Sequence, residues 1–319
     1  MFPEHICNSF KISDITSIKN SLSTNGYAVV NIDSIDIDHV KKLFAIDMAE
    51  ITGNDINFPE LWNKKSAIPN STFPGLMGEY GLSQGKSAWY IRCNRDIINL
   101  YKKLLNADDV VCSMDAIGFS QDNNGYLNGT SLHTDQNPYG VQKDINSIQG
   151  IFYAEDTYGD RAGTAVVPGS HIDYMKHSYT TDNYTPVNQA IYSSNAVKLT
   201  IKAGCLLLFT SKLVHQGVYG SHRLCFMVCY GDKKDRSEQV KKKKITMYLG
   251  GHRSNHWSQY AVNLGWKWEH GESWNMLNST TISPGYSDQI DMLEDEITDP
   301  ESYTDNMDMF IPLDRLSLI

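Results

Sequence analysis

A series of short apolar runs over residues 110–235 constrains the fold more than any other feature of the chain. The runs are separated by turns and read VVCSMDAIGF, IQGIFYAED, TAVVPGSH, AVKLTI, GCLLLFT and LCFMVCYGD, with a shorter segment, HTD, among them. Seven or more short strands at this density are typical of an antiparallel sandwich or barrel and not of a helical fold. We therefore predict a mainly β core.

Helices are predicted mostly upstream of this core. Residues 17–26 have the features of a short helix that ends in Asn-Gly, and the strand YAVVNI follows directly. Apolar residues at helical spacing predict a second helix over residues 36–51. Residues 96–106 form an amphipathic pattern, with Asp96 as the expected N-cap. These helices should pack outside the β core, so the predicted fold class is mainly β with flanking helices.

A single domain can account for all 319 residues. We expect an N-terminal helical and lid region over residues 1–109, the β core over 110–235, and a C-terminal extension over 236–319 that covers the core. Residues 54–87 are rich in Pro, Gly, Asn and aromatic residues and show no stable period. Long irregular segments inside compact domains are usually functional, so we expect a substrate lid there. Residues 288–308 carry many acids and should form a surface tail.

The charge of the chain argues against an extended nucleic-acid interface. Its 28 basic and 37 acidic residues give a net charge of −9, so a small-molecule or peptide substrate fits better. The run KKKK at residues 241–244 is therefore expected to be a solvated loop. No long apolar stretch or signal peptide is evident, and six scattered cysteines lack a CxxC pair. We expect a cytoplasmic protein with reduced thiols and no membrane partner.

One segment of the core, SLHTDQNPYG at residues 131–140, holds a histidine and a carboxylate two residues apart. The side-chain period of a strand is two, so His133 and Asp135 should project to the same face, roughly 6–7 Å apart along the backbone. Together they could hold one metal ion. The alternative is a surface strand that ends in the turn-forming pair Asn137-Pro138. A lone HxD motif favours that alternative, so further ligands must decide.

A second histidine and an arginine follow the apolar strand GCLLLF. His215 begins a turn punctuated by glycine, and Arg223 opens the strand LCFMVCY eight residues later. Two histidines and one carboxylate make the ligand face of non-haem Fe(II), which leaves positions open for oxygen and a bidentate co-substrate. A guanidinium at the mouth of an apolar strand can bind a carboxylate through two hydrogen bonds. The alternative for Arg223 is an ordinary surface arginine.

Three segments make this pattern specific. HTD at 133–135, AGTAVVPGSH at 162–171 and AGCLLLFTSKLVHQG at 203–217 resemble the phytanoyl-CoA dioxygenase-like (PhyH) family of Fe(II)/2-oxoglutarate-dependent oxygenases. The similarity covers residues 20–235. It implies a double-stranded β-helix core of the jelly-roll or cupin-like kind, in a single oxygenase domain that uses Fe(II), 2-oxoglutarate and O2.

The resemblance also implies roles for residues. His133, Asp135 and His215 would bind iron as the catalytic triad, and Arg223 would hold the far carboxylate of 2-oxoglutarate. This arginine follows the histidine at a slightly shorter interval than relatives often show. Halogenases of this class have a small residue in place of the carboxylate, so the presence of Asp135 favours hydroxylation-type chemistry.

Strand parity suggests further residues of the pocket. Gln149 and Tyr153 lie on one face of IQGIFY, and Asp115 or Ser120 lies on the strand upstream. Gln149, Tyr153 and Ser120 are candidates for contacts to the cofactor.

The other histidines are not expected to bind iron. His171 in PGSH is interpreted as structural, because Pro-Gly forms a turn there. His222 would point away from the site. His252 and His256 flank Trp257, where a period of four could place both on one helix face. Zinc binding there is the alternative to a cover over the active-site mouth.

These expectations combine into one function, the oxidation of an unactivated C–H bond by hydroxylation, desaturation or oxidative cyclisation. Trp89, Tyr90 and Arg92 would offer aromatic surface and a cation to a polar small molecule, such as a carboxylate-bearing amino-acid derivative or a natural-product intermediate. One alternative is a peptide or nucleobase hydroxylase of the same fold. Others are a catalytically silent binding protein, which the intact triad disfavours, and a cupin-like metalloenzyme independent of 2-oxoglutarate, which Arg223 disfavours.

Overall fold

The chain forms two compact units in a computed structural model that describes residues 2–52, 76–77, 81–120, 131–139, 143–176, 185–249, 251–260 and 313–319. The first unit comprises Met1–Ile37, Lys103–Leu105 and Gly118–Met227, and the second comprises Asp38–Lys102, Asn106–Ile117 and Val228–Ile319. Most of the expected lid and the whole expected tail lie outside the described residues. The three-region organisation of one domain stays a prediction.

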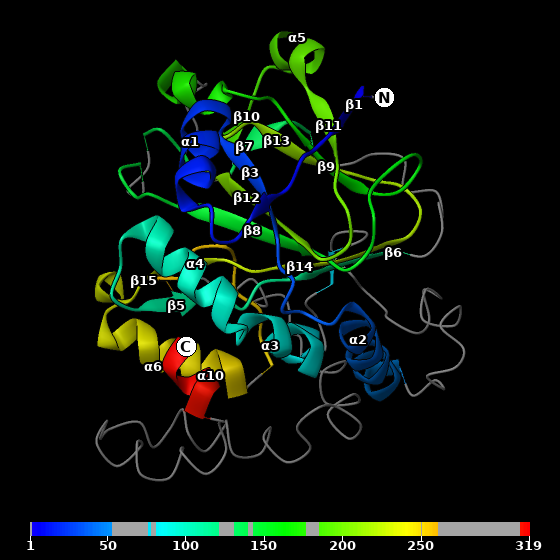
Figure 1. Ribbon diagram of the computed structural model, residues 1–319. Helices are drawn as coiled ribbons and strands as arrows, with labels where there is room; N and C mark the ends of the chain where they lie inside the picture. The colour runs from blue at the N-terminus through cyan, green and yellow to red at the C-terminus, as the bar shows by residue number, and fades with distance from the viewer. Residues whose placement is uncertain are drawn as a thin grey trace, which may run out of the picture. The chain divides into compact units, whose positions relative to one another are not determined.

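Two β-sheets build the first unit (Figure 1). One has the strand order β1-β11-β9-β13-β7-β10, with β1 at Glu4–Ile6, β11 at Val197–Thr200, β9 at Gly163–Val166, β13 at His215–Val218, β7 at His133–Thr134 and β10 at Thr185–Pro186. Within this unit the other runs β2-β3-β12-β8-β14-β6, with β2 at Phe10–Lys11, β3 at Tyr27–Asn31, β12 at Cys205–Thr210, β8 at Ile148–Tyr153, β14 at Arg223–Met227 and β6 at Ile117–Ser120. The β1–β11 and β2–β3 pairs are parallel, and the central pairs of both sheets are antiparallel.

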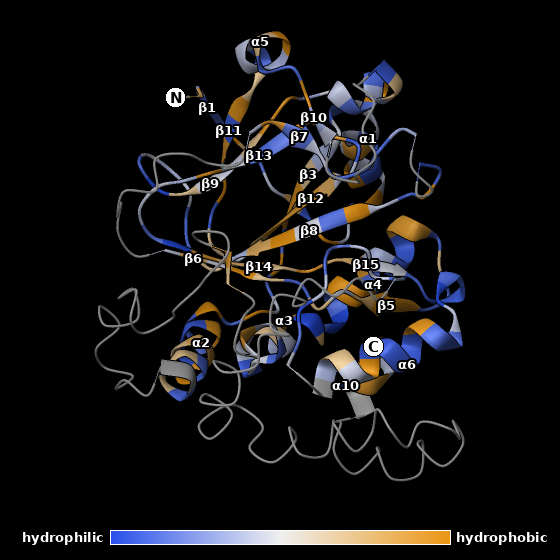
Figure 2. Cartoon of the chain, turned by 180° about the vertical axis from the view of Figure 1, so that it is seen from behind, coloured by the Kyte–Doolittle hydropathy of each residue, from blue (hydrophilic) through white to orange (hydrophobic). Residues whose placement is uncertain are grey.

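Alternating residues of these strands form a core shared by the two sheets. The buried cluster joins strands of both, and includes Tyr27, Val29, Ile151, Tyr153, Val166, Leu199, Leu207 and Phe209. Full burial of one such apolar side chain contributes roughly 1.5–3 kcal/mol. Figure 2 shows β3 and β12 mostly in hydrophobic colour and β7 in hydrophilic colour. The shared core confirms the predicted mainly β fold.

Helix α1 (Ile15–Asn25) packs against β3 and β12. Asp14 caps its first turn, and Gly26 ends it with a positive φ of 83°. A side chain at Gly26 would also collide with Leu213, because a Cβ there would lie 2.6 Å from Leu213 Cδ1. The short helix and the strand after it were therefore predicted correctly. The unit also contains the 3₁₀ helices η3 (Ser170–Lys176) and η4 (Ser193–Asn195) and the short helix α5 (Gln189–Tyr192).

The second unit is mainly helical. Its elements are α2 (Ile37–Thr52), β4 (Leu76–Met77), η2 (Leu82–Gln84), α3 (Lys86–Arg92), α4 (Arg95–Leu105), β5 (Val110–Cys112), β15 (Tyr230–Asp232), η5 (Lys233–Asp235), α6 (Glu238–Leu249) and α10 (Leu313–Leu318). Strands β5 and β15 pair antiparallel. Helix α2 confirms the helix expected over residues 36–51. In the described part of the chain, no helix is long and apolar enough to cross a membrane.

Helix α4 begins one residue earlier than predicted, and its cap differs. Asn94 has extended backbone angles, and its side-chain oxygen accepts hydrogen bonds from the amides of Asp96 and Ile97, each 3.1 Å long. Asp96 instead lies in the first turn, where its negative charge interacts favourably with the positive end of the helix dipole. The expectation that Asp96 is the N-cap was wrong.

Helix α3 buries residues that were expected to offer a binding surface. Trp89 and Arg92 are each 1 % exposed. The Arg92 guanidinium donates to the carbonyl oxygens of Ser83 and Asp115, and the Trp89 indole donates to Gln84 Oε1 over 3.0 Å. The expected aromatic and cationic surface was therefore wrong for both residues, because a helical turn directs them inward.

The basic run at residues 241–244 lies on α6, so the expected solvated loop was wrong. A helix spreads four consecutive residues around its axis, and Lys244 points inward. Its ammonium group is fully buried and donates to the carbonyl oxygens of Cys112 (2.7 Å) and Ser258 (3.0 Å). Burial lowers the pKa of Lys244 to about 8.

We expect this lysine to make stability rise with pH between pH 8 and 10. The unfolded chain keeps the proton up to about pH 10.4, whereas the folded chain releases it near pH 8. The unfolded state therefore binds more protons in this window, and the free energy of unfolding gains about 2 kcal/mol between pH 7 and 9.5. Urea unfolding of wild type and Lys244→Met at both pH values measures the effect. An equal gain in the variant would assign the rise to other groups.

Candidate metal centre

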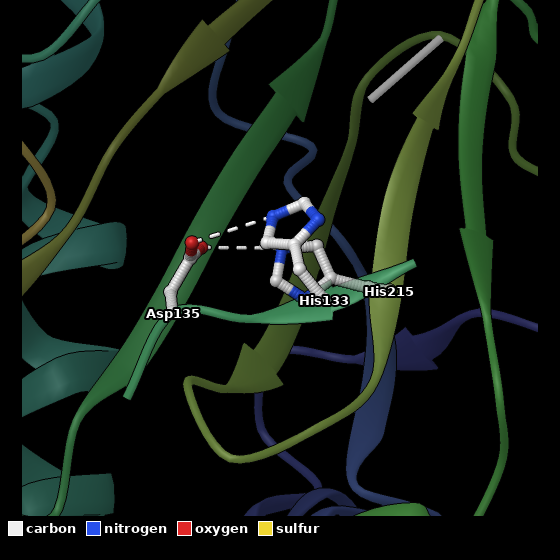
Figure 3. A group of neighbouring side chains, drawn as sticks. All are labelled: His133, Asp135 and His215. Atoms are coloured by element: carbon white, nitrogen blue, oxygen red, sulfur yellow. Dashed lines mark ion pairs between the residues drawn. The ribbon is translucent and has the colours of Figure 1, made fainter. Parts of the chain in front are cut away.

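Two histidines and a carboxylate meet where β7 and β13 lie side by side (Figure 3). His133 of β7 is the register partner of His215 of β13, and Asp135 follows β7 directly. Asp135 Oδ1 lies 3.4 Å from His133 Nε2, and Asp135 Oδ2 lies 3.2 Å from His215 Nε2. One ligand atom from each residue lies within 4.8 Å of the others. Within the described residues, no other group of three or more such side chains has this arrangement.

Backbone carbonyls orient both imidazoles. His133 Nδ1 lies 2.7 Å from the Ser131 oxygen, and His215 Nδ1 lies 2.9 Å from the Leu213 oxygen. A carbonyl can only accept a hydrogen bond, so each Nδ1 carries a proton, which leaves Nε2 as the ring atom that can bind a metal. This arrangement fixes the tautomer in many metal-binding histidines. The donor set therefore fits a divalent metal ion with open coordination positions.

The charges at this centre favour an ionised carboxylate. Burial raises the pKa of Asp135, but attraction to His215 and His133 outweighs burial and holds it well below its usual range. For His133, burial lowers the pKa and the Asp135 charge raises it, with a raised pKa as the net result. Asp135 is thus a carboxylate ready to neutralise a cation.

Arg223, the first residue of β14, is buried in the same unit. It is 6 % exposed, and its Nε donates to Cys225 Sγ over 3.1 Å. Burial lowers the pKa of Arg223, but the effects of Cys225 and Tyr153 outweigh burial and raise it. The guanidinium therefore stays charged. Among the described residues, no carboxylate forms an ion pair with it. The alternative of an ordinary surface arginine was wrong.

A glycine makes room for this guanidinium. A Cβ at Gly118 of β6 would lie 2.5 Å from Cys225 Sγ and 2.8 Å from Arg223 Nε. Both distances are far below an ordinary contact, so only glycine lets the arginine lie against the β6 backbone. Neither Gly118 nor Cys225 was predicted from the sequence.

The four expected pocket residues lie in four different places. Gln149 reaches the triad, because its side-chain amide donates to Asp135 Oδ2 over 2.9 Å. The Tyr153 hydroxyl pairs with that of Thr164 at 2.7 Å, between strands of the two sheets. The Ser120 hydroxyl donates to the Gly220 carbonyl over 3.2 Å. Asp115, the other candidate on that strand, accepts a hydrogen bond from the Ala116 amide in the second unit.

Sequence comparison identifies the family. Residues 60–218 match the model of the phytanoyl-CoA dioxygenase (PhyH) family. The chain belongs to the phytanoyl-CoA dioxygenase family. It is therefore an oxygenase of the Fe(II)- and 2-oxoglutarate-dependent kind, and both cofactors fit the residues described above. No curated protein matches the chain in sequence.

Several solved structures are similar to this phytanoyl-CoA dioxygenase family member, and one of them reaches a TM-score of 0.50. The epimerase SnoN in complex with Fe3+, alpha ketoglutarate and nogalamycin RO is 14 % identical, with 69 % of this chain and 84 % of that chain covered and a TM-score of 0.50. The alpha ketoglutarate-dependent carbocyclase SnoK from nogalamycin biosynthesis is 14 % identical over 71 % and 87 % of the chains, with a TM-score of 0.47. EctD from S. alaskensis in its apoform is 15 % identical over 69 % and 78 %, also with a TM-score of 0.47.

His171, His222, His252 and His256 belong to no group of three or more candidate metal ligands in the described part of this oxygenase. The His171 ring lies 2.9 Å from the Ser23 carbonyl oxygen, as expected of a structural residue. His222 is exposed and has a φ of 40°, just before β14. Residues 251–260 are not helical, so a period of four does not place His252 and His256 on one face. The described residues give no support to a zinc site there.

Proposed function

We propose that this oxygenase oxidises an unactivated C–H bond of a polar small molecule, with His133, Asp135 and His215 as the iron ligands and Arg223 as the anchor for 2-oxoglutarate. The convergence of the three ligands in one unit carries the proposal. When bound, iron and 2-oxoglutarate supply the oxidant for C–H cleavage. The protein contributes positioning of the reactants and exclusion of water.

Burial and charge support the role of Arg223. A buried guanidinium without a carboxylate partner in the described part of the chain is costly, unless a ligand provides the negative charge. Because Nε already bonds to Cys225, the two terminal nitrogens remain as a fork for both oxygens of one carboxylate. The far carboxylate of 2-oxoglutarate matches this requirement.

The chemistry of the substrate is proposed at the level of its class. Asp135 occupies the position at which a halogenase has a small residue, which favours hydroxylation, desaturation or cyclisation. The net charge of −9 disfavours a nucleic-acid substrate. The SnoN structure contains a small organic molecule, nogalamycin RO, in the same fold. The burial of Arg92 removes the main reason to expect a carboxylate on the substrate.

An anaerobic titration tests this function. Addition of Fe(II) and then 2-oxoglutarate to the metal-free protein should produce the weak visible charge-transfer band of an iron-bound 2-oxoglutarate chelate. Succinate lacks the keto group and should produce no band, so it is the control. A protein that binds Fe(II) but shows no band with 2-oxoglutarate would contradict the proposed co-substrate.

A further inference from the structure

A closed ring of hydrogen bonds surrounds the back of Asp135. Gln149 Nε2 donates to Asp135 Oδ2 (2.9 Å) and to Ser211 Oγ (3.1 Å). The Ser211 carbonyl oxygen in turn accepts a hydrogen bond from the Asp135 amide over 3.1 Å. Ser211 therefore holds the Asp135 backbone directly and the Asp135 carboxylate through Gln149.

A second serine supports the ring. The Ser147 and Ser211 hydroxyls lie 2.7 Å apart, and the Ser211 amide donates to the Ser147 carbonyl oxygen over 3.0 Å. Strand pairing brings these residues together, because Gln149 of β8 is the register partner of Phe209 of β12, two residues before Ser211. Gln149 and Ser211 are both buried, so these contacts are shielded from water.

Chemistry decides how the glutamine amide is oriented. An ionised carboxylate only accepts hydrogen bonds, so the NH₂ group of Gln149 must face Asp135. Its two protons then supply both ring contacts, one to the carboxylate and one to Ser211. The Ser147 and Ser211 hydroxyls can hydrogen-bond to each other with either one as the donor. Gln149 thus has a definite donor role in both of its contacts.

We propose that Gln149 is a positioning residue for the metal ligand Asp135, an inference that rests on the proposed function. Its amide holds one carboxylate oxygen, Oδ2, and so fixes the plane of the carboxylate before metal arrives. With Oδ2 engaged, Oδ1 is the better placed oxygen for a metal, and binding through one oxygen leaves more coordination positions open. Partners of metal ligands typically contribute about 10- to 100-fold to metal affinity or activity.

Cobalt(II) binding under anaerobic conditions tests the role without turnover, since the visible absorption of Co(II) reports its ligand geometry. Gln149→Met keeps the length of the side chain and removes both donors. We expect its Co(II) affinity to fall about 10- to 100-fold and its visible spectrum to change. Ser211→Ala keeps the Gln149 contact to Asp135, and we expect a smaller fall in the same direction.

Thr157→Val is the matched control. The Thr157 hydroxyl is buried in the same unit and bonds to the backbone of Leu199 and Ile201 at 2.9 and 2.8 Å, away from the triad. Its loss should lower stability in urea and leave Co(II) affinity unchanged. If Gln149→Met or, should that variant not fold, Ser211→Ala binds Co(II) with wild-type affinity and spectrum, the positioning role is overturned.

One further variant separates this inference from the proposed function. Asp135→Ala should lose Co(II) binding whether or not Gln149 positions the carboxylate. Loss in Asp135→Ala with full binding in Gln149→Met rejects the positioning role alone. Full binding in Asp135→Ala rejects the metal site itself.

Discussion

Asp135→Ala should abolish 2-oxoglutarate turnover and lower Fe(II) affinity by more than about 100-fold. Loss of a residue that supports a metal ligand lowers metal affinity or activity by about 10- to 100-fold. Loss of the ligand itself should lower metal affinity by more. Asp135 also supplies the negative charge of the centre, so its loss leaves two neutral imidazoles to hold a divalent cation. Succinate formation and bound iron in the purified variant measure the two effects.

His133→Ala and His215→Ala should give the same result with the fold intact. The three proposed ligands lie at or beside strand ends and outside the hydrophobic cluster shared by the sheets. Circular dichroism should therefore match that of the wild type. Asp135→Gly is a sharper variant, because it opens a coordination position on the metal. Hydroxylation should not be restored in it. A variant that keeps both iron and succinate formation would remove the substituted residue from the ligand set.

The triad could be predicted because its geometry is local or recurrent. His133 and Asp135 are separated by one strand period, and the structure places their ligand atoms 3.4 Å apart. His215 follows an apolar strand whose pattern is readable by itself. The strands of the core were predicted for the same reason, since each run of alternating or continuous apolar residues is a local signal.

The supports of the site depend on strand pairing, which a single sequence does not reveal. Gln149 was expected only as a residue of the pocket, and its contact to Ser211 follows from the pairing of β8 with β12. One feature of the sequence could have placed Ser211 near the site. Ser211 shares strand parity with Phe209, and the centre of the Phe209 ring lies 4.7 Å from that of His215. No feature of the sequence could have indicated the role of Gly118, since that role depends on where the Arg223 side chain lies.

The errors in the second unit have a related cause. Lys244 and Arg92 have a strong preference for the surface, so composition predicts exposure. Both can be buried because nearby backbone carbonyls accept hydrogen bonds from their charged groups. Those carbonyls belong to residues distant in the sequence, such as Cys112 and Asp115, and become visible only after the chain has folded.

The second large effect is expected at Arg223, where Arg223→Leu should raise the apparent constant for 2-oxoglutarate far more than it lowers metal affinity. Removal of one partner of a buried, hydrogen-bonded charge pair costs about 2–5 kcal/mol, or roughly 30- to several-thousand-fold in affinity. Leucine keeps the apolar stem of the side chain and removes the fork. Turnover as a function of 2-oxoglutarate, together with Co(II) affinity, separates the two effects.

Gly118→Ala tests the same anchor without changing the arginine itself. The added methyl group would overlap Cys225 Sγ and Arg223 Nε, so the guanidinium must shift away from its position on β14. We expect a rise in the 2-oxoglutarate constant that is smaller than in Arg223→Leu. Co(II) affinity should be unchanged, because the atoms nearest to a Cβ at Gly118 belong to Cys225 and Arg223 and not to the triad. A rise in both variants places the carboxylate anchor at Arg223. A wild-type constant in Arg223→Leu would place it on another residue.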